Sequence, residues 1–343
     1  MTNPVPRARL GRTGLTVSRI ALGAMMFGGR TDEAEAARIF DEATAAGVDF
    51  VDTADNYNAG RSEEIVGRLL RGRRHDIVLA TKLGNPMGSG PHERGLSRRW
   101  ILEETERSLR RLGVETIDIL YLRKEDHGTP LEETVRAIAD LVRARKVRYL
   151  GVSNHRAWRV ARIANLCDEM GIDRPAVCQL YYHAFNRMAE IELIPACTAL
   201  GIGVYAYSPL ARGVLTGKYR AGGEAPADSR AASGDKRILE TEYHPAALAA
   251  AERLRAHCEE RGIAMADFAA AWILANPQVT GLVAGPRTLE QWHAYLQAPS
   301  VSLAGSDEAF VDALVPPGTT AIPHHIDPAY APAGRASPCD PAG

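Results

Sequence analysis

Short apolar segments alternate with longer amphipathic segments along almost the whole chain. The short segments have the length of buried strands, and the segments between them repeat their apolar residues with the period of a helix. The pattern predicts eight strands, at Ile20–Leu22, Phe50–Asp52, Ile77–Thr81, Ile117–Leu122, Val147–Val152, Ala176–Leu180, Gly203–Ala206 and Val279–Val283.

Several predicted helices carry end signals. One helical face repeats every three or four residues, at Leu131, Val135, Ile138 and Val142. The run TPLE at 129–132 precedes this face and predicts a capping box at Thr129, with Pro130 in the first helical position. An earlier helix is predicted to begin after Asp32, with Glu35 three residues on, and to end at Gly47.

The regular alternation of strand and helix predicts an α/β fold with a parallel sheet. Eight such units indicate a (β/α)8 TIM barrel, in which the chemistry takes place at the carboxyl ends of the strands. The N-terminal RARLGRTGLTVSRI predicts an additional β-hairpin that turns at Thr13-Gly14. We expect residues 1–330 to form a single barrel and residues 331–343 to form a flexible C-terminal tail.

Long loops interrupt the alternation, and we expect them to be functional. The glycine-rich segment Gly84–Gly95 follows the third strand, and the segment Tyr207–His244 is far longer than an ordinary loop between strand and helix. Beyond Pro316 the chain is rich in alanine and proline and is predicted to begin as a loop over the barrel mouth. We expect the first and the last of these segments, with the exit of the fourth strand, to contact the substrate.

Composition argues against several classes of function. The 343 residues include 41 Lys+Arg and 42 Asp+Glu, a net charge of −1, so we expect no nucleic-acid partner and no membrane partner. No segment approaches the roughly 18 apolar residues that span a bilayer, and we expect no secretory signal. The five cysteines, none in a CxxC pair, are typical of reduced thiols in a cytoplasmic enzyme: Cys167, Cys178, Cys197, Cys258 and Cys339.

Two other motifs are rejected on their context. GIGVYA at 201–206 satisfies GxGxxA, but a dinucleotide fingerprint needs a strand before the glycines and a helix after them, and here the order is reversed. Gly201 is better interpreted as a helix C-cap. His324, His325 and Asp327 do not have the spacing of a metal site, so we expect no metal.

Three reactive side chains follow two successive predicted strands. Asp52 and Tyr57 lie in DTADNY, and Lys82 lies in LATKLG. A lysine ammonium beside a tyrosine hydroxyl favours the phenolate, which makes the phenol a better proton donor to a developing alkoxide. The aspartate would hold the lysine charged and in place. This trio predicts assistance to carbonyl reduction, with the hydride supplied by another group.

With these residues identified, the chain resembles the aldo-keto reductase family, from the N-terminal hairpin to the helix that begins near Thr288. The matching stretches occur in the family's order: DTADNY, RSEEIVGRLL, VLATKLG, RSLRRLGVETIDILYL, GVSNH, YSPLARGVLTGKY and GPRTLEQ. The resemblance implies an NADPH-dependent oxidoreductase that interconverts small-molecule carbonyl compounds and alcohols. By the same resemblance, Tyr57 matches the proton donor, and Lys82 and Asp52 match its activating pair.

The resemblance also implies an NADP(H) site. Ser153, Asn154 and Gln179 match the residues that bind the nicotinamide carboxamide, and Tyr207 matches the aromatic residue that stacks on the ring. Ser208, Leu210, Gly213, Leu215 and Lys218 resemble the segment over the pyrophosphate. Gly285, Arg287 and Gln291 match the adenosine end, and Gly23, Met25 and Asp52 are further expected cofactor-binding positions.

The adenosine end has physical support from its local pattern. Thr288 and Gln291 form a capping-box pattern, so Arg287 is expected beside a helix N-terminus, a suitable place for the extra phosphate of NADP. Tyr295 stands where the family often has an asparagine near the adenine. Its ring can stack on the adenine instead, which leaves the preference between NADP and NAD open.

The chain departs from the family at the end of the fourth strand. The family usually has a histidine there, and this chain has Arg123, while His127 lies too far along the loop to replace it. A guanidinium is always charged and donates in a fixed fork. Three outcomes stay open. Arg123 orients an anionic or multiply oxygenated substrate, or it polarises the carbonyl itself. Alternatively, ordinary turnover is lost, which leaves a specialised catalyst or an NADP-binding regulatory or interaction protein like the family's channel-associated β subunits.

Overall fold

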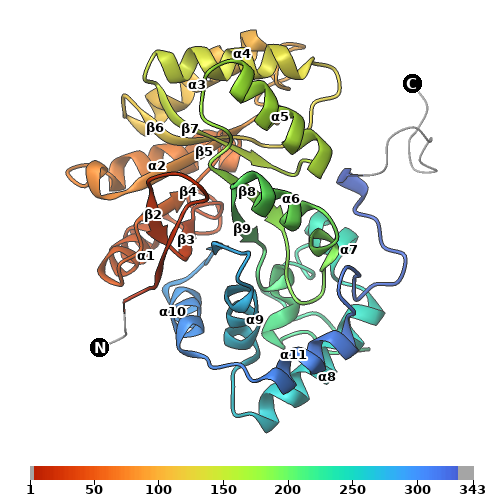
Figure 1. Cartoon of the computed structure of the whole chain (residues 1–343). Coiled ribbons are helices and arrows are strands. Elements are labelled where there is room, and N and C mark those ends of the chain that lie inside the picture. The colour runs from red at the N-terminus through yellow and green to blue at the C-terminus, as the bar shows by residue number, and fades with distance from the viewer. Residues whose placement is uncertain (1–3, 331–343) are drawn as a thin grey trace.

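Eight parallel strands close into a barrel with helices around it (Figure 1). The computed structural model describes residues 4–330, and the predicted tail at 331–343 lies outside them. Around the barrel the strands follow the order β10-β3-β4-β5-β6-β7-β8-β9, and a separate two-stranded antiparallel sheet precedes them. The predicted (β/α)8 TIM barrel with an N-terminal hairpin is therefore confirmed.

Each predicted strand is present, with ends that differ from the prediction by one or two residues at most. The barrel strands are buried along nearly their whole length, which explains their continuous apolar sequences. The strands are β1 Arg7–Arg9, β2 Thr16–Ser18, β3 Ile20–Gly23, β4 Phe50–Asp52, β5 Val78–Leu83, β6 Ile117–Leu122, β7 Val147–Ser153, β8 Val177–Tyr181, β9 Gly203–Tyr207 and β10 Gly281–Ala284.

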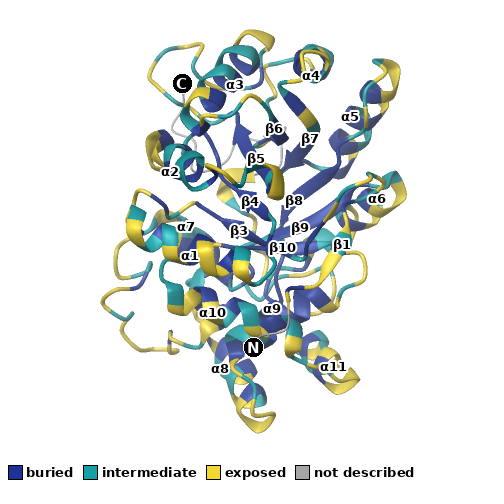
Figure 2. Ribbon diagram, turned by 90° about the vertical axis from the view of Figure 1, so that its left-hand side faces the viewer, coloured by how far each residue is buried: buried dark blue, intermediate teal, exposed yellow. Residues whose placement is uncertain are grey.

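The helices cover the outside of the barrel. Figure 2 shows buried strands inside and exposed residues on the outer faces of the helices. Within residues 4–330, no helix has the length and apolar composition needed to cross a membrane. The helices are α1 Glu33–Ala45, α2 Arg61–Leu69, α3 Arg98–Leu112, α4 Leu131–Arg143, α5 Ala157–Glu169, α6 Leu193–Leu200, α7 Lys236–Thr241, α8 Pro245–Glu260, α9 Met265–Ala275, α10 Leu289–Gln297 and α11 Gly305–Leu314.

Most of the predicted helix ends are confirmed. The Asp32 side chain accepts a hydrogen bond from the backbone N–H of Glu35, at 2.8 Å, and caps α1. Gly47 follows α1 and Gly201 caps α6, and both adopt left-handed conformations, with φ of 85° and 70°. These conformations cost glycine little, which explains why the helices end there.

The capping box predicted at Thr129 is wrong. The helix begins one residue later, at Leu131, and Pro130 occupies the N-cap without a side-chain hydrogen bond. The Thr129 hydroxyl instead donates to the Asp126 carboxylate at 2.8 Å. A hydrogen bond to a charged carboxylate is stronger than one between neutral groups. This bond therefore favours the loop conformation of Thr129 over the N-cap position.

The N-terminal hairpin closes one end of the barrel. Its turn spans residues 11–14 and includes the predicted Thr13-Gly14. Leu10 is fully buried in the cluster that fills the barrel interior. The Tyr205 hydroxyl of β9 donates to the Ser18 carbonyl at 2.6 Å. Because the hairpin seals the amino ends of the strands, only the carboxyl ends remain accessible for a site.

Candidate active site

Asp52 and Lys82 form a buried ion pair at the carboxyl ends of β4 and β5. The Lys82 ammonium contacts the Asp52 carboxylate and also donates to the Thr53 carbonyl at 2.8 Å. The side chains are only 2% and 3% exposed. Gln179 from β8 donates its amide N–H to the second carboxylate oxygen of Asp52 at 2.9 Å. Both oxygens of the carboxylate are therefore engaged, which fixes the direction of the lysine.

Tyr57 lies above this pair. It begins a tight 3-10 turn, Tyr57–Gly60, in which Asn58 has a left-handed φ of 49°. The Asn58 amide donates to the carbonyls of Met25 and Phe27, at 3.0 and 2.8 Å, and this holds the turn against the segment after β3. The Lys82 ammonium nitrogen lies 5.2 Å from the centroid of the Tyr57 ring. The predicted trio is thus brought together in space.

Arg123 joins the trio from the end of β6. Its guanidinium carbon lies 4.9 Å from the centroid of the Tyr57 ring, and Nη1 donates to the Asn56 side-chain oxygen at 3.3 Å. Burial is the largest single influence on the pKa of Arg123 and lowers it, but the facing groups together raise it more, so the guanidinium stays charged; these groups are Tyr57, Asp55, Tyr330 and Asp52. His127 is exposed on the following loop, where it faces Glu125 at 3.3 Å.

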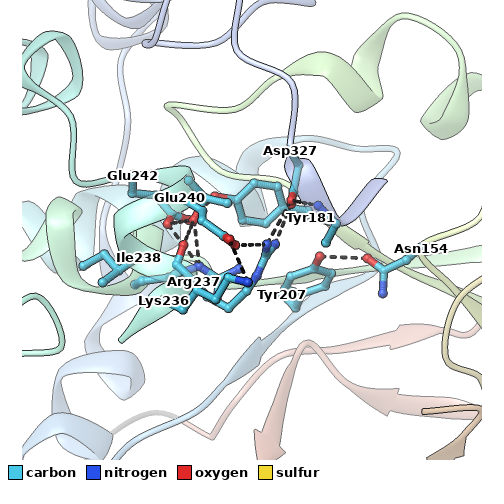
Figure 3. Close-up of polar contacts among 12 residues, drawn as sticks. Asn154, Tyr181, Tyr207, Lys236, Arg237, Ile238, Glu240, Glu242 and Asp327 are labelled. Atoms are coloured by element: carbon cyan, nitrogen blue, oxygen red, sulfur yellow. Dashed lines mark hydrogen bonds and ion pairs between the residues drawn. The ribbon is translucent and has the colours of Figure 1, made fainter. Parts of the chain in front are cut away.

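The residues matched to the nicotinamide end are linked to this group. The Asn154 amide donates to the Ser153 hydroxyl at 2.8 Å and to the Arg123 carbonyl at 3.0 Å. The Tyr207 hydroxyl donates to the Asn154 side-chain oxygen at 2.8 Å (Figure 3). The Tyr207 ring is tilted by 30° against that of Tyr181, with centroids 5.4 Å apart. An aromatic surface therefore lies beside the polar group, as stacking on a flat ring requires.

A polar network that the sequence did not predict borders this surface. Figure 3 shows Arg237 of α7 paired with Asp327 of the C-terminal segment, through hydrogen bonds of 2.6 and 3.0 Å. Nearby, the Tyr181 hydroxyl donates to the buried carboxylate of Glu242, which also pairs with Arg212 at 3.0 Å. Burial is the main cause that raises the pKa of Glu242. The network ties the long loop after β9 to the chain beyond Pro316, as the predicted placement of that segment over the mouth requires.

A second group gathers cations at the far end of the long loop. Arg287 pairs with the carboxylate of Asp228 at 2.8 Å. Arg30 donates to the Asp228 carbonyl at 3.0 Å. Burial lowers the pKa of Lys218, and the charges of Arg287, Arg230 and Arg30 lower it further. Arg30, Arg230 and Asp228 carry no signal in the sequence, because their neighbours in space are distant in the chain.

The capping box predicted at Thr288 and Gln291 is confirmed only in part. The Thr288 hydroxyl oxygen accepts from the Gln291 N–H at 3.3 Å and caps α10. The Gln291 side chain, however, accepts from the N–H of Arg287 at 2.9 Å rather than from Thr288. Tyr295 is buried in the main hydrophobic core, so its ring serves packing.

At two glycines of the predicted cofactor set, a larger side chain would meet a neighbouring group. Gly213 has a φ of 106°, and a Cβ there would lie 3.0 Å from the Lys218 side chain. A Cβ on Gly23 would lie 2.8 Å from Val283. The other predicted positions are distributed over the same two loops and strand ends: Met25, Ser208, Leu210, Leu215 and Gly285.

The two groups fit a phosphorylated dinucleotide. One end offers an aromatic face and amide groups, and the other gathers four cations, Arg30, Lys218, Arg230 and Arg287, with Asp228 and Asp235 as the acids that pair with them. Phosphate oxygens bind arginine and lysine side chains through charge-assisted hydrogen bonds. Within residues 4–330, no cluster of three or more histidine, cysteine or acidic side chains has metal-binding geometry.

Several known proteins are similar to this chain over most of its length. The chain is 40% identical over 305 residues to the "Uncharacterized oxidoreductase YrpG" of Bacillus subtilis, which covers 86% of this chain and 91% of that protein. It is 37% identical over 300 residues to a "Probable voltage-gated potassium channel subunit beta" of Arabidopsis thaliana, covering 85% and 90%. It is 33% identical over 299 residues to the "L-glyceraldehyde 3-phosphate reductase" of Escherichia coli K12, covering 84% and 86%.

A model of the aldo/keto reductase family matches residues 19–315, which span all eight barrel strands and both groups of the site. Family membership and the oxidoreductase names among the relatives support oxidoreduction between carbonyl and alcohol, for which the family typically uses a nicotinamide cofactor. The chain belongs to the aldo/keto reductase family.

Proposed function

We propose that the protein is an NADPH-dependent reductase of small-molecule carbonyl compounds, with Tyr57 as the proton donor. The observation that carries the proposal is the buried Lys82–Asp52 pair directly beside the Tyr57 ring. Removing an ion pair from water costs free energy, so a buried pair is a weak contribution to stability. This pair lies at the carboxyl ends of the barrel strands, where active sites of such barrels lie, and we therefore infer a catalytic role for it.

Proton transfer to the substrate uses four residues of the chain, each with its own role. Tyr57 gives its hydroxyl proton to the substrate oxygen as that oxygen gains negative charge. Lys82 stabilises the phenolate left behind, because an opposite charge nearby favours the ionised form. Asp52 keeps the ammonium in place, and Gln179 keeps the carboxylate in place.

The cofactor site follows from the two groups described above. Ser153, Asn154 and Tyr207 would hold the nicotinamide end, and Lys218 and Arg287 would hold the phosphates. Bound NADPH would supply the hydride. We assign NADPH rather than NADH because Arg287 directly precedes the N-cap of α10 within a cluster of cations, where an additional phosphate gains both charge and helix-terminus interactions.

Arg123 directs the substrate class toward anionic carbonyl compounds. Within residues 4–330 its guanidinium makes one side-chain hydrogen bond, to Asn56, so further donors remain for a ligand. A carboxylate or phosphate accepts such donors in pairs. The relative named L-glyceraldehyde 3-phosphate reductase is an example, by its name, of a family member that acts on a phosphorylated aldehyde.

A second candidate function is an NADP-binding regulatory or interaction protein with little turnover. Arg123 in place of the usual histidine and the relative named as a potassium channel β subunit favour it. The intact Asp52, Tyr57 and Lys82 arrangement favours the enzyme.

Steady-state turnover separates the two candidates. Purified protein with NADPH is assayed by absorbance against simple aldehydes, ketones, keto acids and phosphorylated aldehydes. The reductase proposal predicts turnover, fastest with an anionic substrate. Binding of NADPH without turnover on any member of the panel would instead support the interaction protein.

A further inference from the structure

Three buried carboxyl groups lie behind the loop that carries Tyr57. Asp55 comes from that loop, Glu63 from α2 and Glu104 from α3, and their exposed fractions are 1%, 0% and 0%. Arg111, also on α3, is the cation that contacts this group most directly. Buried charges are stable only when they are paired and hydrogen-bonded, so three carboxylates need more than one guanidinium.

The single guanidinium serves two of the three groups. Arg111 donates Nε to Glu63 at 2.6 Å and Nη2 to Glu104. Glu63 also accepts from the Thr81 hydroxyl. Glu104 gains a weaker contribution from Arg107, 3.8 Å from its second oxygen. Glu63 is therefore compensated at both oxygens, and Glu104 is compensated in part, since its Oε2 has no hydrogen-bond partner among the described residues and burial raises its pKa. Asp55 is the one of the three carboxyl groups that has no ion pair with Arg111.

Asp55 has one engaged oxygen and one without a partner. Its Oδ1 accepts from the backbone N–H of Asn56 at 2.6 Å. Its Oδ2 is buried and has no hydrogen-bond partner among the described residues. An ionised carboxylate in this state would be strongly unfavourable, whereas a neutral carboxyl tolerates it better. Burial, and then the charges of Glu63 and Glu104, raise the pKa of Asp55 to about 8.

Asp55 is connected to the candidate site through the next residue. Asn56 donates its backbone N–H to Asp55 and accepts from Arg123 with its side-chain oxygen, at 3.3 Å. The charge of Arg123 also acts on Asp55 directly, and it lowers the pKa that the charges of Glu63 and Glu104 raise. A change in the charge of Asp55 is therefore felt by Arg123 directly and through the Asn56 backbone.

We propose that Asp55 is a positioning residue that holds a proton in the active enzyme and, by remaining neutral, leaves the Arg123 guanidinium free to bind the substrate. Loss of that proton creates a carboxylate that competes with the substrate for Arg123. The inference rests on the proposed reductase function, but its first step concerns only the protonation of Asp55 and its coupling to Arg123.

The consequence is a loss of substrate affinity at alkaline pH. When Asp55 ionises, an anionic substrate meets both a less available guanidinium and an additional negative charge. KM should rise for anionic carbonyl compounds as the pH passes about 8, with a smaller change in kcat. Asp55→Asn has the shape of the neutral acid and keeps the oxygen that accepts from Asn56, so it should behave like the protonated enzyme at every pH.

The first experiment measures the coupling between Asp55 and Arg123 and requires no enzymatic turnover. Full-length protein labelled with 13C at aspartate carboxyls and with 15N at arginine side chains is titrated by NMR between pH 5 and pH 10, a range chosen around the pKa of about 8. We expect one carboxyl signal, absent in Asp55→Asn, to titrate near pH 8, and the Arg123 Nε signal to move with the same midpoint. The Arg123 signal is assigned with Arg123→Lys. An Asp55 signal that is already ionised at pH 6, or an Arg123 signal that is insensitive to it, would overturn the inference.

The second experiment measures how KM depends on pH in the wild type, in Asp55→Asn and in a matched control variant. The control is Asp267→Asn, because Asp267 on α9 also has a pKa raised by burial but lies outside the site. We expect Asp55→Asn to match the wild type at pH 6 and to lack its rise in KM near pH 8, and Asp267→Asn to follow the wild type throughout. If the wild type turns over but Asp55→Asn keeps the same pH profile, the inference fails and the reductase function stands. If no carbonyl compound is reduced at all, the reductase function fails, and the NMR titration still decides the state of Asp55.

Discussion

The guanidinium carbon of Arg123 lies 4.9 Å from the centroid of the Tyr57 ring, on the side of the site where aldo-keto reductases usually present a histidine. The Tyr57 ring thus lies close to two cations, since Lys82 is 5.2 Å from the same centroid. Cations near the face of an aromatic ring are attracted to it, so the ring helps to fix Arg123 in place. We therefore expect the arginine at this position to affect the preference for substrate more than it affects the proton donor.

Replacement of Arg123 by histidine should exchange one substrate preference for another. An imidazole restores a neutral donor to the carbonyl oxygen and removes the charge that binds an anionic group. We expect Arg123→His to raise kcat/KM for simple aldehydes and to lower it for keto acids or phosphorylated aldehydes by about tenfold or more, the size of a lost charge-assisted hydrogen bond. Arg123→Lys, which keeps the charge, serves as the control. A loss for every substrate, or no change for any, would contradict this role.

Arg287 should determine the choice between the two nicotinamide dinucleotides. Only NADP has the additional phosphate that we propose this side chain binds. We expect Arg287→Ala to weaken NADPH binding by about tenfold or more and to leave NADH binding nearly unchanged. Fluorescence quenching titrations measure both affinities, with Arg253→Ala on the exposed face of α8 as a control. An equal loss for the two cofactors would place the phosphate elsewhere.

The stability of the protein should depend on pH through Asp55. Its pKa is raised from 3.8 to about 8 in the folded state, so the folded protein binds more protons than the unfolded chain between these values. The free energy of unfolding therefore falls as the pH rises from about 4 to about 8, by an amount on the order of 5 kcal/mol from this group.

Asp55→Asn removes that contribution, so the difference in stability between variant and wild type should grow in favour of the variant over the same pH range. Urea unfolding at several pH values measures it, and the comparison cancels the other titrating groups. A difference that stays constant with pH would show that Asp55 is ionised in the folded protein.

Gly23 should be required for the closure of the barrel. A Cβ at this position would lie 2.8 Å from a Val283 methyl group and 3.1 Å from the Ala284 carbonyl oxygen of the neighbouring strand. We expect Gly23→Ala to lower the free energy of unfolding by about 1–3 kcal/mol, the usual cost of overpacking. Gly14→Ala is the control, because a Cβ there meets nothing within 4 Å. Equal stabilities for the two variants would rule out this steric requirement.

The sequence predicted the fold well because its signals are local. Each barrel strand is an apolar segment whose ends differ from the structure by at most two residues, and Gly47 and Gly201 end helices through their own backbone conformations. The convergence of Asp52, Tyr57 and Lys82 was also predictable, since the barrel brings all strand ends to one rim.

The rest depended on pairs that are distant in the chain. Arg237 and Asp327 are 90 residues apart, and Arg30 and Asp228 are 198 apart, so no local pattern connects them. The lack of a partner for Asp55 Oδ2 results from the packing of three elements, and the motif DTADNY is identical whether Asp55 is charged or neutral. At Thr129 a local capping pattern was present, but the hydroxyl donates to the Asp126 carboxylate instead of capping the helix.

A single-turnover measurement with Tyr57→Phe tests the central claim most directly. Protein loaded with one equivalent of NADPH is mixed with an excess of the best carbonyl substrate, and the decay of the cofactor absorbance is followed in wild type and variant. Both should bind NADPH equally, because Tyr57 is not among the residues that we propose to hold the cofactor. We expect the variant to react at least about a hundredfold more slowly, the lower end of what a positioned proton donor contributes. Decay at the wild-type rate in Tyr57→Phe would contradict the assignment of Tyr57 as the proton donor.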